Sequence, residues 1–157
     1  MIQGLYTLQH IRNWEVIGEY DFHNGIVDVG MNYLLDAGFD AGSQETQWFI
    51  GLVNNSGFSA LANADTMASH AGWTEFGNYT EATRPEWAPS AAAARAITNA
   101  TTVDFTINAS GVLKGIFVTS DNTKSGTAGT LWSTAAFTST ISVSNGDTFK
   151  ITYSISG

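Results

Sequence analysis

The residues best suited to catalysis or ligand binding lie between positions 65 and 87. Glu75, Glu81 and Glu86 alternate there with aromatic residues, and acids beside aromatic rings are common in clefts that hold sugars. Hydrolysis of a glycosidic bond would need two of these carboxyls on opposite sides of the bond, one of them with a raised pKa. Loops of acidic proteins also carry such residues without a chemical role. The segment therefore predicts glycan contact more strongly than glycan cleavage.

The metal-ligating residue types do not form a recognisable motif. His10, His23 and His70 lie in separate segments, and no His-x-x-x-His pair is present. Asp65 and His70 could approach each other around a helical turn, but two such residues more often lie in a solvated loop without binding a metal. The acids of residues 36–40 lack the alternating spacing and the final Glu of a calcium loop. We predict no metal site and no cofactor.

Motifs for nucleotide binding or nucleophilic catalysis are also missing from the sequence. There is no Gly-rich phosphate loop, no dinucleotide fingerprint after a strand, and no Gly-x-Ser-x-Gly turn. The chain has no cysteine, so it has neither a thiolate nucleophile nor a disulfide framework. These patterns predict no catalytic residues and a protein that is not an enzyme.

The composition limits the partners that the protein can bind. The 157 residues are 43% hydrophobic and 12% aromatic, which is typical of a folded chain, but only 13% charged. A net charge of −8 disfavours nucleic acids and anionic membranes, because binding to phosphate depends on Lys and Arg. The first ten residues contain no basic stretch followed by an apolar one, so we expect no signal peptide and synthesis in the cytoplasm.

Short alternating segments in the last third of the chain predict a mainly β fold. We expect strands near residues 103–107, 112–119, 130–137, 141–143 and 149–155, separated by turns rich in Gly, Ser and Asn. This pattern is typical of an antiparallel β-sandwich or jelly roll. The whole chain, residues 1–157, is predicted to be a single β domain.

The first half adds further elements to this domain. Alternating apolar residues from Gly4 to Phe22 predict two strands joined near Arg12 and Asn13, although about residues 1–14 could instead extend as an N-terminal arm. One short helix is expected near residues 28–37, and a buried strand at 47–53. The long connection from 60 to 94 either packs on the body as a lid or is presented to a partner.

Several segments together resemble small structural proteins of tailed bacteriophages. The segments are His23-Asn-Gly-Ile-Val-Asp-Val-Gly-Met-Asn-Tyr-Leu-Leu-Asp36, Trp48-Phe-Ile-Gly-Leu-Val53, Ala64-Asp-Thr-Met-Ala-Ser-His-Ala-Gly-Trp-Thr-Glu-Phe76, Tyr79 with Arg84, and Ser144-Asn-Gly-Asp-Thr-Phe-Lys-Ile-Thr-Tyr-Ser-Ile-Ser156. The resemblance covers most of the chain, in order, and residues 65–73 are its most specific part. It implies a protein of the virion and carries over no catalytic residues.

Within the virion, we expect a decoration (cement) protein on the capsid exterior, bound to the major capsid protein and to copies of itself as a homotrimer. The chain has no room for the shaft or anchoring module of a tail fibre. The alternative is a tail-tip or fibre-associated module that binds a receptor or glycan. Interfaces favour aromatic residues and Arg, although aromatic residues of small β proteins also form the core. The candidate partner contacts are Trp14, Trp73, Phe76, Tyr79, Arg84 and Trp87.

Overall fold

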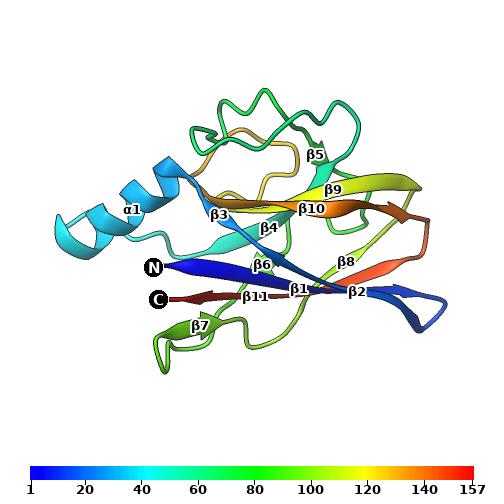
Figure 1. Ribbon diagram of the computed structural model, residues 1–157, viewed down its shortest axis with the longest axis horizontal. Coiled ribbons are helices and arrows are strands. Elements are labelled where there is room, and N and C mark those ends of the chain that lie inside the picture. The colour runs from blue at the N-terminus through cyan, green and yellow to red at the C-terminus, as the bar shows by residue number, and fades with distance from the viewer.

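A computed structural model describes all residues 1–157 and shows two antiparallel β-sheets packed face to face, with one helix (Figure 1). The predicted mainly β, single-helix sandwich is therefore confirmed. The main core of 22 buried residues lies between the sheets, and period-2 alternation places its members on the inner faces.

The first sheet is built around the two chain termini. Its strands are β1 (Gln3–Arg12), β2 (Glu15–His23), β7 (Ala96–Thr98), β8 (Val103–Thr106) and β11 (Thr148–Ser156). They follow the order β2-β1-β11-β7, and β8 also pairs with β11. Strand β1 is hydrogen-bonded on both sides, to β2 and to β11, so residues 3–12 do not form an extended arm. The alternative prediction, two strands joined near Arg12 and Asn13, is the correct one because alternate β1 side chains are buried in the core.

The second sheet contains the central, most apolar strands. Its members are β3 (Gly25–Ile26), β4 (Trp48–Asn54), β5 (Glu75–Phe76), β6 (Glu86–Trp87), β9 (Gly111–Thr119) and β10 (Leu131–Val143). The order is β3-β10-β9-β4-β5, and β6 also pairs with β4. The sequence predicted two strands where β10 is one, because the exposed polar run Thr138-Ser-Thr140 interrupts its apolar pattern. The pairing with β9 is irregular at that point.

The helix α1 (Asp28–Phe39) connects β3 to β4 and ends two residues after the predicted end at Ala37. It packs closely on the second sheet at Gly30, where a Cβ atom would collide with the backbone carbonyl of Trp132. The segment after β4 crosses the outer face of the same sheet (Figure 1). A second core cluster of six buried residues lies beneath it, with Met67 and Trp73 above Phe117. This long segment is therefore packed down on the body.

Candidate functional site

The structure separates the six candidate contact residues into one exposed side chain and five buried ones. Trp14 is 99% exposed, whereas the other five are between 1% and 4% exposed. Phe76, Tyr79 and Trp87 belong to the core between the sheets, and Trp73 belongs to the outer cluster. Because these side chains are covered by the protein itself, we correct their assignment from partner contact to core. The fifth buried residue, Arg84, is held in a polar network.

That network anchors the aromatic segment of residues 73–87. The Arg84 Nη2 donates to Glu75 Oε2 at 2.8 Å and to the Gly126 carbonyl at 2.9 Å, and Nη1 donates to the Asp121 carbonyl at 2.8 Å. The Tyr79 hydroxyl also donates to Glu75, at 3.2 Å. Burial and the neighbouring Glu75 carboxylate raise the pKa of Tyr79 far above its ordinary value. The buried charges are thus satisfied internally, which indicates a structural role.

The three glutamates that suggested sugar chemistry have different partners. Glu75 is bound to Arg84, and Glu81 accepts a hydrogen bond from the Thr106 backbone N–H at 3.1 Å. The Glu86 carboxylate has no hydrogen-bond or ion-pair partner in the protein, and the residue lines a pocket near α1. The contacts of Glu75 and Glu81 stabilise loops, so the structure gives no support for a paired acid and base among the three.

Asp65 and His70 do not form the pair that their spacing would allow. Asp65 Oδ2 accepts hydrogen bonds from the Trp73 indole N–H and the Ala62 backbone N–H, both at 2.9 Å. The His70 Nδ1–H donates to the Thr66 carbonyl at 3.0 Å, and its ring stacks on Trp73. Both side chains therefore organise the turn that places Trp73 on the sheet. No group of three or more His, Asp or Glu side chains is arranged to hold a metal ion.

A second buried polar cluster was missed by the sequence analysis. Asp147, in the turn before β11, accepts hydrogen bonds from His10 Nε2 at 2.7 Å, from Arg12 Nε at 2.8 Å and from the Ser144 backbone N–H at 2.8 Å. Burial alone would raise the pKa of Asp147, but these hydrogen bonds outweigh it and hold the pKa well below its usual range. The His10 ring stacks on Phe149. This cluster fastens the end of β1 to the turn before β11.

The exposed Trp14 occupies an unusual backbone position. Arg12 pairs with Glu15, which leaves Asn13 and Trp14 as a two-residue turn between β1 and β2. Both turn residues have positive φ, 52° and 69°, as in the type I′ turns that match the twist of a hairpin. Glycine is the usual second residue of such a turn, and a bulky side chain at positive φ is strained. Here the strained position carries the largest side chain available.

The apolar surface continues from Trp14 along β2. Val16 is 51% exposed and Ile17 is 48% exposed, and β2 is an edge strand of its sheet. The turn lies at the far end of β1 and β2 from the two chain termini (Figure 1). We call this surface, made of Trp14, Val16 and Ile17, the hairpin tip. It is an exposed apolar projection of the kind that marks interaction sites.

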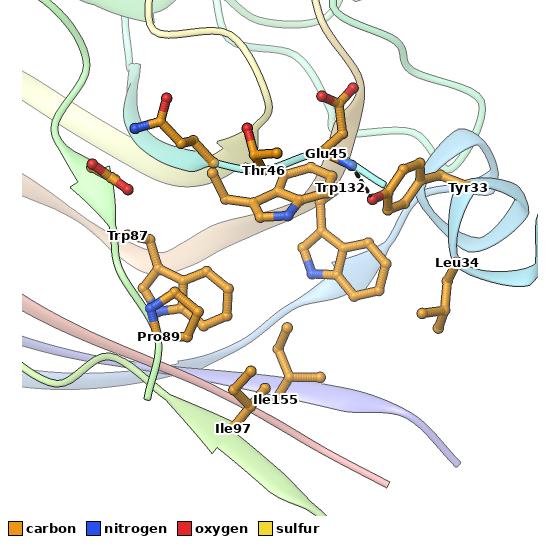
Figure 2. A pocket seen from close by; sticks show the side chains of 12 residues that line it. Tyr33, Leu34, Glu45, Thr46, Trp87, Pro89, Ile97, Trp132 and Ile155 are labelled. Atoms are coloured by element: carbon orange, nitrogen blue, oxygen red, sulfur yellow. Dashed lines mark hydrogen bonds between the residues drawn. The ribbon is translucent and has the colours of Figure 1, made fainter. Parts of the chain in front are cut away.

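A pocket of about 310 Å³ lies between the two sheets, beside α1. Its aromatic lining comes from Tyr33 of α1, Trp48 of β4, Trp87 of β6 and Trp132 of β10. The rings of Trp48 and Tyr33 meet edge to face at 5.3 Å, and those of Trp48 and Trp132 at 6.1 Å. Figure 2 shows Trp87 and Trp132 on either side of a space that Ile97 and Ile155 close below, with Tyr33 beyond Trp132. We call this cavity the aromatic pocket.

The polar lining of the aromatic pocket is acidic. Glu45 and Glu86 both border it, and no Lys, Arg or His does. Trp87 was selected from the sequence as a partner contact and Glu86 as an acid beside aromatic rings. Their neighbours Tyr33, Trp48 and Trp132 come from three distant segments. No local pattern in the sequence indicates that these rings meet.

In comparisons with known proteins, no family model and no curated protein matches this chain. The structure contains no helix with the length and apolar character needed to cross a bilayer.

Proposed function

We propose that this protein is a non-enzymatic structural component of a bacteriophage particle that decorates the capsid exterior. Its partners in this proposal are the major capsid protein and further copies of itself, arranged as a homotrimer. The resemblance of most of the chain to small phage structural proteins supports a place in the virion. The hairpin tip supports attachment to another protein.

The single observation that carries the proposal is Trp14. Its side chain is 99% exposed, and the strained turn that displays it would be relaxed by glycine. Strain of this kind is usually kept where it serves a function. Tryptophan is also the residue type that most often dominates the binding energy of a protein interface, at the centre of a desolvated patch. A fixed tryptophan on a rigid hairpin is well suited to insertion into a pocket of a capsid subunit.

The rest of the architecture fits a cement protein. A decoration protein stabilises a shell by binding the assembled state rather than free subunits, which requires a rigid body and broad contacts. Here the sandwich is rigid at its centre, and its two buried ion-paired networks fasten loops to it. The low content of charged residues, 13%, suits surfaces that become desolvated on binding.

A receptor- or glycan-binding module at the tail tip is the second candidate, and the aromatic pocket is the observation that favours it. A concave site lined mainly by hydrophobic and aromatic side chains is the usual form of a small-ligand site. Under this alternative, the pocket rather than the hairpin tip would carry the principal function.

The deciding experiment is gold-labelled antibody against the protein on intact phage particles, with the copy number measured by quantitative mass spectrometry. Decoration predicts dense label over the head and tens to hundreds of copies per particle, following from repetition over the shell. Label confined to the tail, at a handful of copies, would overturn the capsid assignment in favour of the tail module. Size-exclusion chromatography with light scattering tests the trimer, which requires a mass three times the 16.8 kDa of one chain.

A further inference from the structure

We propose that the aromatic pocket binds an organic cation, namely a ligand that carries an alkylated ammonium group. This inference is independent of where the protein sits in the particle. It rests on two properties of the pocket: the mutual orientation of its rings and the charge of its lining.

The aromatic rings that line the pocket lie at large angles to one another. Trp48 stands at 74° to the ring of Tyr33 and at 60° to that of Trp132, so the three rings do not stack on one another. Such crossed rings can direct several π surfaces at one ligand. The negative potential above each ring attracts a cation, most strongly for tryptophan. An alkylated ammonium group also matches the apolar part of the lining, because its charge is surrounded by methyl or methylene groups.

The charge of the lining favours a cation over a neutral or anionic ligand. Glu45 and Glu86 contribute two carboxylates, and no basic side chain borders the pocket. Glu86 has no hydrogen-bond partner in the protein, and Glu45 has only a long contact of 3.5 Å from the Thr130 hydroxyl. Neither carboxylate is therefore neutralised by a basic side chain of the protein. The net charge of −8 would also raise the local concentration of cations near the protein.

Only some of the polar groups in this pocket have already formed hydrogen bonds. The indole N–H of Trp132 donates to the Tyr153 hydroxyl at 2.9 Å, and that of Trp87 donates to the Tyr153 carbonyl at 3.0 Å. The Trp48 indole N–H, the Thr46 hydroxyl and the Gln47 amide have no hydrogen-bond partner in the protein, so the test below also offers a sugar. Trp87 and Trp132 are only 4% and 6% exposed, so the half-buried rings of Trp48 and Tyr33 offer most of the aromatic surface that a cation would contact.

The test uses choline chloride and its neutral isostere 3,3-dimethylbutan-1-ol, which has a carbon atom in place of the ammonium nitrogen. The chain provides an internal control, because Trp48, Trp87 and Trp132 line the pocket while Trp14 and Trp73 do not. In ¹H–¹⁵N spectra of the full chain, choline should shift the pocket indole signals and leave the other two in place. We expect choline to bind at least about tenfold more tightly than the isostere, an effect of the size expected for a desolvated cation–π contact.

Variants separate the charge from the shape of the pocket. Glu45→Gln and Glu86→Gln should each weaken choline binding by about three- to tenfold and leave the isostere unaffected. Glu15→Gln is the matched control, because Glu15 is an exposed acid in the hairpin and far from the pocket lining. Trp48→Leu should abolish choline binding, and its unchanged backbone spectrum would show that the fold is intact.

Three results would overturn the proposal. The first is the absence of pocket indole shifts with choline, and the second is equal binding of choline and the neutral isostere. The third is a shift of the same signals by methyl glucoside or methyl galactoside in place of choline, which would assign the pocket to a sugar. A failure here leaves the capsid assignment unchanged, because immunolabelling of particles tests that assignment separately.

Discussion

The hairpin tip and the aromatic segment of residues 73–87 both contain tryptophan, yet they place it in opposite environments. The hairpin tip exposes Trp14 at the end of two regular strands, whereas the segment buries Trp73 and Trp87 although it has little regular structure. The difference follows from what holds each region. Backbone pairing of β1 with β2 fixes the hairpin, so its turn side chains are not needed for folding.

The aromatic segment has no such ladder along most of its length. Side chains of the segment hold it in place. Its own Arg84 and Glu75 form a buried ion pair, and its large rings belong to both core clusters. An irregular segment must replace missing backbone pairing with other buried contacts. Substitutions in the two regions should therefore separate stability from binding, with large losses of stability in the segment and almost none at the hairpin tip.

The largest effect is expected for Glu75→Gln. The substitution leaves the fully buried Arg84 guanidinium with only the more distant and partly exposed Asp121 carboxylate, at 3.8 Å, as a counter-charge, and should lower the free energy of unfolding by about 4 kcal/mol. Urea denaturation followed by circular dichroism measures this change. The double variant Glu75→Leu with Arg84→Met removes both charges and should recover much of the loss. A loss below about 1 kcal/mol for Glu75→Gln would show that the network does not fasten the segment.

Trp87→Ala should be the next most destabilising change, by about 3–4 kcal/mol, because it leaves a cavity in the main core. The ring packs on Tyr153, and its N–H donates to the Tyr153 carbonyl. Trp87→Phe keeps most of the apolar volume and should cost less than half as much. If Trp87→Ala had normal stability but reduced attachment to particles, the residue would be a partner contact after all.

The Asp147 cluster predicts acid sensitivity at the end of β1. The pKa of Asp147 is lowered in the folded protein. The stabilising contribution of its carboxylate is therefore complete above the ordinary aspartate pKa of 3.8 and is lost as the pH falls below that value. Asp147→Asn should cost about 2–3 kcal/mol at neutral pH. Denaturation curves of both proteins between pH 6 and pH 2 test this. The two stabilities should converge on acidification, and a constant difference would contradict the assignment.

Most of the fold could be predicted because it depends on local patterns. Alternation of apolar residues located the strands near residues 103–107, 112–119 and 149–155, and apolar spacing located α1 to within two residues. The extended-arm version was wrong because alternation along one strand does not show which strands lie beside it, and β1 has a neighbour on each side. That neighbour, β11, lies at the other end of the sequence.

The candidate sites were less predictable because they depend on long-range contacts. His10 and Asp147 are 137 positions apart, and the rings of the aromatic pocket come from four separate elements. Aromatic content correctly marked residues 73–87 as important but could not distinguish core from contact. Besides Glu75, the hydrogen-bond partners of Arg84 include two carbonyl groups of a distant loop, which no residue type reveals. Only Trp14 was both selected from the sequence and found exposed.

The smallest change in stability is expected at Trp14, where the effect on attachment should be greatest. Trp14→Ala removes an exposed side chain and should alter the free energy of unfolding by no more than about 0.5 kcal/mol. Trp14→Gly should stabilise the protein, by about 0.5–1 kcal/mol, because glycine adopts the positive φ of this turn without strain.

Both Trp14 variants should nevertheless bind capsids stripped of the protein at least about 30-fold more weakly, which corresponds to the loss of one interface hot spot. Co-sedimentation with stripped capsids measures this affinity, and Glu15→Gln in the same hairpin is the control that should bind normally. A Trp14→Gly protein that is more stable yet fails to bind would demonstrate that the strain serves attachment. Normal binding of both variants would remove the hairpin tip from the interface and leave the aromatic pocket as the remaining candidate contact.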